Sequence, residues 1–433
     1  MQPLTLQQLV AYVWSQHRSD FYRTFWRQRG FNPETDFHSQ DDLVNIPVVR
    51  KEDLMTTTLW ERTAPSEQDY MFPAMSSGTT DQPLVSLQTM SVIPPYYEYI
   101  TNKCQYSSVL IIRHPSSAHF ALTITSRYLR PGTLIAEGDT HDLDSAAELA
   151  REIGMDHLAT TPTIAVQFAR ALTAKAYSPL RLRFLALSGE PLTTPLLTVL
   201  NRLYPNALHL YAYGTSEGCT PLGHQSSLCD NLHTISPNAY HLNDRNVIFE
   251  VVNGTLVVTV LHATPFPLIR YDTGDRIIFR PEFTCACGFP SGPIAIIGPR
   301  FRNKSYKLGS LVFRPEHITR VLSEFSNVLT GDFALQLEQK IVGDGLVTVP
   351  SLRLRPRETL KAKLWTTTKL TSILTPTLER ALVGGLYVWP HAPLRKAVEN
   401  GVAEPISIAY DQTVLGSFIF PPVELMKPFT WMR

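Results

Sequence analysis

Between Ser107 and Gly214 the sequence alternates between short apolar strands and amphipathic helices, and this alternation restricts the fold more than any other feature. The segment SSVLIIRH has a strand pattern, and LDSAAELAREIG is typical of a helix with a polar start and a glycine end. The series continues with HLATTP, TIAVQFARAL, RLRFLALSG, PLTTPLLTVLNRLYP and ALHLYAYG. Repeated βα units of this length place their strands parallel, so we expect a parallel sheet with helices on both faces.

The flanking segments have different patterns. The first fifty residues favour helices, whereas after Gly214 two β-branched runs flank Asn253-Gly254, which is a strong hairpin signal. From about Arg300 the pattern becomes strand, strand, a helical region broken near Pro376, and a strand LYVW. The sequence therefore predicts an α/β fold with a large N-terminal body over 1–299, which holds the parallel βα sheet and the β-rich segment. A small C-terminal α+β domain over 300–433 follows, and we assign no function to its atypical tail, AEPISIAYDQTVLGSFIFPPVELMKPFTWMR.

The composition is that of a soluble globular protein. The chain has 433 residues, of which 44% are hydrophobic and 18% are charged, and its formal net charge is +1. A charge so close to zero provides no field that favours nucleic acid or an anionic membrane. No apolar run approaches the ~20 residues of a membrane helix, and the N-terminus lacks the basic region of a signal peptide. We therefore expect a cytoplasmic protein without nucleic-acid or membrane partners.

A run of hydroxyl side chains surrounds Gly78 in the stretch AMSSGTTDQPL. Such a run suits a phosphate-binding loop, although alone it is more often a polar turn. Four further motifs follow in order: SGEPLT from Ser188, YAYGTSEG from Tyr211, RYDTGD from Arg270 and GPRFRNKSYKLGSLVFRPEHI from Gly298. Their joint order resembles that of the adenylate-forming superfamily of acyl-coenzyme A ligases and adenylation domains. The upstream SDFYRTFWRQRGFNP and the later CACG make the chain most similar to the phenylacetate-coenzyme A ligase branch.

The resemblance implies an adenylate-forming acid-thiol ligase that uses ATP and Mg²⁺ to activate a carboxylic acid. The acyl group would pass to the thiol of coenzyme A or of a carrier protein, and homodimers are common in the family. Tyr213 would stack on adenine, Glu217 would hold Mg²⁺ as a catalytic residue, and Asp275, assisted by Arg300, would bind both ribose hydroxyls. The other expected nucleotide-binding residues are Ser76, Ser77, Gly78, Thr79, Thr80, Gly189, Glu190, Pro191, Gly214 and Thr215.

Taken singly, these residues have simpler interpretations. Asp275 alone fits a tight surface turn, and Glu217 alone fits a solvated helix start. Lys396 is the best match to the family's catalytic lysine, and the alternative is a surface lysine that opens a helix or turn.

Three departures from the family pattern leave other activities open. Asp81-Gln82 stands where glycine and lysine are usual, which places a negative charge beside the triphosphate. Arg302-Asn303 replaces an aspartate pair at the domain hinge, and Arg395 precedes Lys396 where glycine is usual. One alternative is therefore a degenerate homologue that binds nucleotide without turnover. Another is an adenylating enzyme that hands its acyl-adenylate to an amine.

Aromatic residues indicate the acid pocket. Tyr96, Tyr97, His119 and Phe120 lie where the family builds this pocket, and aromatic walls favour a flat acid, although aromatic residues are more often ordinary core.

Cysteine spacing suggests a metal site. Five cysteines in a chain of this class argue against a disulfide framework. Cys285-x-Cys287 together with Cys229-x₃-His233 gives a Cys₃His set suited to a structural Zn²⁺, and the alternative is buried free cysteine.

Overall fold

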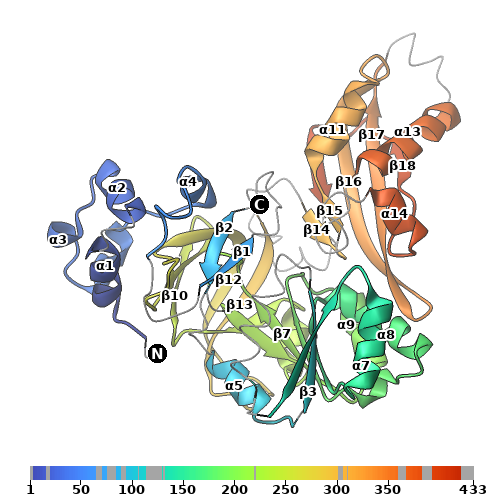
Figure 1. Ribbon diagram of the computed structural model, residues 1–433. Helices are drawn as coiled ribbons and strands as arrows, with labels where there is room; N and C mark the ends of the chain where they lie inside the picture. Colours follow the sequence, from blue (N-terminus) through green and yellow to red (C-terminus); the bar gives the residue numbers. More distant parts are fainter. Residues whose placement is uncertain are drawn as a thin grey trace.

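Figure 1 shows a computed structural model of the protein. The structure describes residues 3–15, 20–64, 71–75, 84–88, 94–105, 107–113, 129, 132–218, 221–300, 306–309, 311–358, 367–382 and 393–420, without the side chains of residues 75, 299, 300, 307 and 367.

An eleven-stranded sheet forms the centre of the protein. Its parallel half has the order β4–β3–β5–β6–β7, with β3 (Ser108–Arg113), β4 (Leu134–Asp139), β5 (His157–Thr160), β6 (Phe184–Ser188) and β7 (Leu208–Tyr213). Helices α7 (Leu143–Glu152), α8 (Pro162–Ala174) and α9 (Thr194–Leu203) share one apolar cluster with these strands. The short helix α5 (Pro95–Thr101) packs with Phe184 and Leu210 in a separate cluster. The predicted α/β fold with parallel βα units is confirmed.

Hydroxyl side chains begin the helices of this half. Thr161 and Thr193 precede α8 and α9, and each accepts a hydrogen bond from a backbone N–H of the first turn. A proline occupies the first turn of both helices, where its missing N–H costs nothing. These residues start α8 and α9 directly after the loops that follow β5 and β6, so that the two helices can pack against the sheet.

The other half of the sheet is antiparallel, with the order β10–β11–β12–β13–β9–β8 leading to β7. It consists of β8 (Gly223–Ser226), β9 (Ala239–Leu242), β10 (Val247–Val252), β11 (Thr255–Val260), β12 (Tyr271–Phe283) and β13 (Gly292–Arg300), with α10 (Asp230–Ile235) between β8 and β9. Asn253 and Gly254 have φ angles of 53° and 75°, which a tight hairpin turn requires. The hairpin predicted at Asn253-Gly254 is therefore present between β10 and β11.

The N-terminal helices cover one side of the antiparallel half (Figure 1). They are α1 (Leu6–Ser15), α2 (Phe21–Gln28), α3 (Pro33–Asp36), the 3₁₀ helix η1 (Gln40–Asn45) and α4 (Lys51–Met55). A hairpin of β1 (Phe72–Met75) and β2 (Val85–Gln88) follows.

Arg270 attaches the N-terminal segment to the sheet. Its buried guanidinium lies 2.9 Å from the Glu250 carboxylate and donates to the carbonyls of Val44 and Ile46. Its φ of 46° lies in the left-handed region, which is uncommon for a residue other than glycine. The buried contacts of the side chain offset this backbone cost.

The C-terminal part forms a four-stranded sheet in the order β18–β17–β16–β19. Its elements are β14 (Tyr306–Leu308), β15 (Leu311–Phe313), α11 (Pro315–Ser323), β16 (Leu329–Val342), β17 (Gly345–Pro356), α13 (Thr367–Ala381), α14 (Leu394–Glu399), β18 (Ser407–Tyr410) and β19 (Ser417–Phe420). The tail therefore supplies both edge strands, each parallel to its neighbour. Within the described residues, no helix combines the length and apolarity that a membrane crossing requires.

The helix predicted to break near Pro376 continues through it, so that prediction is wrong. The missing N–H of Pro376 removes one hydrogen bond, to the carbonyl four residues earlier. Leucines at a spacing of four residues nevertheless bury one face of the helix in the C-terminal core: Leu370, Leu374, Leu378 and Leu382. Burial of this face outweighs the lost hydrogen bond. The strand predicted at LYVW lies outside the described residues.

The long β16–β17 hairpin reaches from the C-terminal part to α8 and α9 (Figure 1). Leu346 joins the apolar cluster of the large sheet, and the Thr193 hydroxyl donates to Oε1 of Gln339. Arg202 donates to the carbonyl of Gly343 at 2.8 Å. The boundary predicted near residue 300 lies where β13 ends, and this division of the chain stays a prediction.

We expect Arg270→Ala to lower the free energy of unfolding by about 3 kcal/mol, because it removes the partner of the Glu250 carboxylate and the donor to the carbonyls of Val44 and Ile46. Urea unfolding followed by tryptophan fluorescence measures the change. The control is Arg353→Ala, which removes an exposed ion pair with Asp411 at 3.5 Å and is expected to cost less than about 1 kcal/mol. Equal losses in the two variants would contradict the role assigned to Arg270.

Candidate functional site

Two of the predicted nucleotide-binding residues are in direct contact. Tyr213 ends β7 and Asp275 lies near the start of β12, and the Tyr213 hydroxyl donates to Oδ2 of Asp275 at 2.6 Å. Asp275 is 8% exposed, and the register of β12 and β13 places its backbone opposite Arg300. A phenol and a carboxylate from distant strands thus form one corner of a candidate site.

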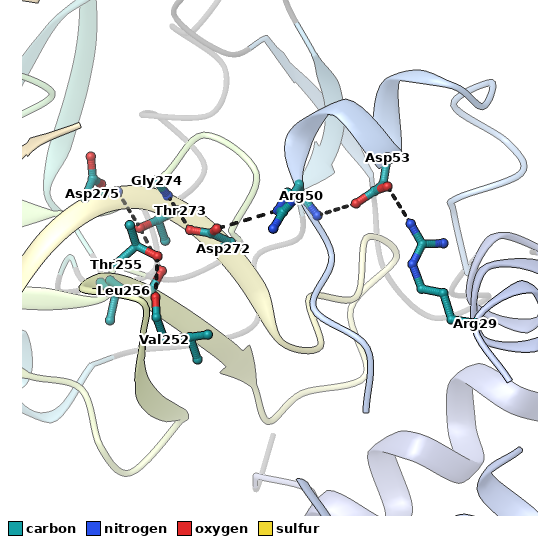
Figure 2. Close-up of polar contacts among 10 residues, drawn as sticks. All are labelled: Arg29, Arg50, Asp53, Val252, Thr255, Leu256, Asp272, Thr273, Gly274 and Asp275. Atoms are coloured by element: carbon teal, nitrogen blue, oxygen red, sulfur yellow. Dashed lines mark hydrogen bonds and ion pairs between the residues drawn. The ribbon is translucent and has the colours of Figure 1, made fainter. Parts of the chain in front are cut away.

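The start of β12, which carries Asp275, is held by hydrogen bonds of its own side chains (Figure 2). The Thr273 hydroxyl donates to a carbonyl of β11 at 3.0 Å and accepts from the N–H of Asp275 at 3.2 Å. Asp272 accepts from the N–H of Gly274 at 2.9 Å and lies 4.0 Å from the Arg50 guanidinium. These contacts fix the backbone on both sides of Gly274, so the orientation of the Asp275 carboxylate is set by the fold.

A second carboxylate, that of Glu217, is buried in the turn after β7. The hydroxyl of Ser216 donates to it at 3.3 Å. The carbonyl of Ser216 in turn accepts from the Ser86 hydroxyl and from the Gln88 amide, each at 2.7 Å. Ser86 and Gln88 are fully buried on β2, so this strand is attached to the turn that holds Glu217.

The β1–β2 hairpin connects Glu217 to the hydroxyl-rich motif. Met75 pairs with Val85 at the end of the hairpin, and the motif joins these two strands in the chain. In the sequence, Ser76–Thr80 therefore lie between the two strands of this hairpin, and its second strand, β2, contacts the turn that holds Glu217. Sequence reasoning missed Ser86 and Gln88, and the only signal for them was two polar residues at alternate positions of a short strand.

The turn after β6 contains the predicted residues Gly189, Glu190 and Pro191. Gly189 has a φ of 89°, where a side chain would be strained. The Glu190 carboxylate accepts from the backbone N–H of Thr163 at 3.1 Å and from its hydroxyl at 2.6 Å. This carboxylate therefore ties the turn to the start of α8.

Gly214 and Thr215 directly follow β7, between Tyr213 and the Glu217 turn. The hydroxyl of Thr215, a buried residue, accepts from the N–H of Gly218 at 3.2 Å. Thr215 therefore closes the turn in which Glu217 lies.

Several predicted residues lie outside the described part of the chain, and their roles stay predictions. They are Ser76, Ser77, Gly78, Thr79, Thr80, Asp81, Gln82, His119, Phe120, Arg302 and Asn303, together with the side chain of Arg300. Lys396 is described and lies on α14 in the C-terminal part. Its neighbour Arg395 lies 3.0 Å from Glu399 on the same helix. The catalytic role of Lys396 also stays a prediction.

Three of the predicted metal ligands come together, but with a different histidine. The ligand atoms of Cys229, His241, Cys285 and Cys287 all lie within 4.8 Å of one another. His233 is outside this group, and its Nε2 is buried without a hydrogen-bond partner among the described residues. His233 is on α10, whereas His241 is on β9, which pairs with β13 next to the Cys285–Cys287 turn. Spacing in the sequence could not reveal this choice, because it depends on strand pairing.

The thiols in this group differ in acidity. Hydrogen bonding with the Cys229 thiol holds the pKa of the Cys287 thiol well below its ordinary value. Burial raises the pKa of Cys285 to about 11.

Tyr96 and Tyr97, predicted for the acid pocket, lie buried on α5. The Tyr96 hydroxyl forms hydrogen bonds of 2.9 Å with both Ser226 and Cys229, and its ring stacks on His241 at 4.8 Å. Tyr96 thus contacts the cysteine group, and the pocket role of α5 stays a prediction.

Comparison with known proteins gives two kinds of relative. No family model matches the chain. A phenylacetate-coenzyme A ligase from Thermus thermophilus is 25% identical over 303 residues, which cover 66% of this chain and 67% of that protein.

Among solved structures, the fold matches 2-hydroxyisobutyryl-CoA ligase. In its thioesterification state, with 2-HIB-AMP and CoA, the TM-score is 0.63 and the identity 17%, over 99% of this chain and 90% of that one. In the postadenylation state with 2-HIB-AMP the TM-score is 0.56 over the same shares of both chains. Both kinds of relative are acid-thiol ligases, so the predicted resemblance of this chain to the adenylate-forming enzymes, and to their phenylacetate-coenzyme A ligase branch, is confirmed.

Proposed function

We propose that this protein uses ATP to activate a carboxylic acid as an acyl-adenylate, with release of pyrophosphate, and then transfers the acyl group to the thiol of coenzyme A. The contact between Tyr213 and Asp275 carries this proposal. Two motif residues that the resemblance assigns to the adenosine are 62 residues apart in sequence and touch in the fold. The 2-hydroxyisobutyryl-CoA ligase structure supplies the second support, because its ligands, 2-HIB-AMP and CoA, are of the kinds that the proposed reaction needs.

The described residues suit the proposed binding tasks. Asp275 offers a carboxylate, and a carboxylate has two acceptor oxygens that can bind both hydroxyls of a ribose. Glu217 offers the hard oxygen ligands that Mg²⁺ prefers, and its buried position strengthens the interaction with a cation. Mg²⁺ bound at Glu217 would neutralise charge on the triphosphate. The chain itself contributes positioning, which is the larger part of such a reaction.

Acid-dependent exchange between ATP and pyrophosphate tests the first half-reaction over a panel of aryl, hydroxy, fatty and amino acids. We expect Asp275→Ala to lower the exchange rate by about 10²- to 10³-fold, since two charge-assisted hydrogen bonds to the ribose are lost. Tyr213→Phe, which keeps the ring and removes only the hydroxyl that bonds to the Asp275 carboxylate, should lower it by about tenfold.

The matched control is Asp144→Ala, a position at the start of α7 where exchange should be unchanged. Full exchange in Asp275→Ala would contradict the proposed site. Absence of exchange with every acid, together with ATP binding in calorimetry, would favour the degenerate homologue.

The second half-reaction shows whether the acyl acceptor is coenzyme A, a carrier protein or an amine. We expect the wild-type protein, once its acid is known, to form a thioester with free coenzyme A that mass spectrometry detects. The control replaces coenzyme A with hydroxylamine, which traps the acyl-adenylate directly. Hydroxamate without any thioester would contradict coenzyme A as acceptor and would favour a carrier protein or an amine.

The contacts of β2 allow a test of whether this strand positions the turn that holds Glu217. Ser86→Ala and Gln88→Leu each remove a donor from the Ser216 carbonyl beside Glu217. We expect the KM for ATP to rise by about threefold to tenfold, because one hydrogen bond contributes about 1 kcal/mol, while the KM for the acid stays unchanged.

Ser108→Ala is the control for these variants, since the Ser108 hydroxyl donates at 2.9 Å to the carbonyl of Gly154, away from the turn. It should lower thermal stability to a similar extent without raising the KM for ATP. A rise in that KM in all three variants would show a general loss of stability in place of a positioning role.

A further inference from the structure

We propose that Cys229, His241, Cys285 and Cys287 bind one Zn²⁺ ion in a closed structural site. This site is independent of the proposed reaction with ATP.

The spacing of the ligand atoms fits tetrahedral zinc. Nε2 of His241 lies 3.8 Å from Sγ of Cys229 and 3.6 Å from Sγ of Cys287. In a tetrahedral site with Zn–S bonds of about 2.3 Å and Zn–N bonds of about 2.0 Å, sulfur and nitrogen are about 3.5 Å apart. The two measured distances are therefore within about 0.3 Å of the tetrahedral value, and all four ligand atoms lie within 4.8 Å of one another.

The ligands come from three separate places in the chain. Cys229 precedes α10, His241 lies on β9, and the two other cysteines lie in the turn between β12 and β13. All three cysteines are free thiols. Three thiols and an imidazole are the ligand types that zinc prefers, and their convergence is difficult to explain by apolar packing, which needs no sulfur.

Residues around the group orient the ligands. The N–H of Ser226 donates to Sγ of Cys229 at 3.3 Å, and the Tyr96 hydroxyl lies 2.9 Å from the same sulfur. Donors of this kind stabilise a metal-bound thiolate. The stacked Tyr96 ring also fixes the plane of the His241 imidazole.

Asn231 attaches the cysteine turn to α10. Its amide donates to the carbonyl of Thr284 at 3.0 Å and accepts from the N–H of Ala286 at 3.0 Å. Asn231 therefore holds the turn that carries Cys285 and Cys287 near Cys229 through contacts with the backbone of that turn. The surroundings of the group are built from polar contacts to α10 as well as from aromatic packing.

Burial and location favour a structural role over a catalytic one. The four residues are between 0% and 6% exposed, so protein surrounds the group and leaves no open side for a substrate. In the β12–β13 pairing, Asp275 lies opposite Arg300 and Phe283 lies opposite Gly292. These pairs are eight residues apart on each strand, which is roughly 25 Å along an extended strand. The zinc would thus hold the turn between β12 and β13 against α10, at the end of the pairing away from Asp275.

Metal analysis of the full-length protein, purified without a histidine tag, tests the proposal. We expect about one zinc per chain in the wild type and in His233→Gln, and less than about a tenth of an equivalent in His241→Gln. His233→Gln is a matched control, because it removes a buried imidazole that the sequence spacing favoured as the ligand. Cys104→Ser, a half-buried cysteine outside the group, should also keep the metal.

Two measurements on the wild type keep the test informative if His241→Gln does not fold. Mercurial modification of the thiols should release the zinc as three thiols react, and cobalt-substituted protein should show thiolate-to-cobalt charge-transfer absorption. Wild-type protein with less than about a tenth of an equivalent of zinc would overturn the proposal. Loss of zinc in His233→Gln with retention in His241→Gln would overturn the ligand set.

Discussion

Backbone hydrogen bonds join eleven strands into one sheet, and the positions of the candidate functional residues follow from this strand pairing. The change of direction occurs between β7 and β8, where parallel pairing on one side meets antiparallel pairing on the other. Ligands of open α/β sheets bind beyond the carboxyl ends of the parallel strands. Tyr213 ends the last parallel strand, so the corner that it forms with Asp275 lies at that edge of the sheet.

The fold could be predicted where local sequence and tertiary contacts agree. The βα alternation and Asn253-Gly254 are local signals, and the sheet uses them as expected. Pro376 is a local signal that tertiary packing overrides, because the leucine face of α13 needs burial along its whole length. The two edge strands of the tail had no such signal. They are four residues long and form only because β16 and β17 present free edges to them.

The candidate site was predictable to a different extent. Motif order made Tyr213, Glu217 and Asp275 candidates, and they lie at the end of β7, in the turn after it and near the start of β12 respectively. The supporting residues could not be found in this way. Ser86 and Gln88 act on a carbonyl 130 and 128 residues away, and His241 joins the cysteines only through the β9–β13 pairing. Residue type and spacing therefore located the groups, and pairing of distant strands selected their partners.

The contacts of the β16–β17 hairpin are relevant to how one chain could carry out both half-reactions. Its contacts with α9 include an exposed ion pair between Arg202 and Asp344 at 3.6 Å, the Thr193–Gln339 hydrogen bond and the burial of Leu346. These contribute less than about 1, about 1 and about 2 kcal/mol respectively. A sum of a few kcal/mol is large enough to favour one arrangement of the C-terminal part, and small enough for a bound ligand to overcome. A change in the position of the C-terminal part between the two half-reactions is therefore compatible with this contact, and the hairpin supplies an energy against which such a change would work.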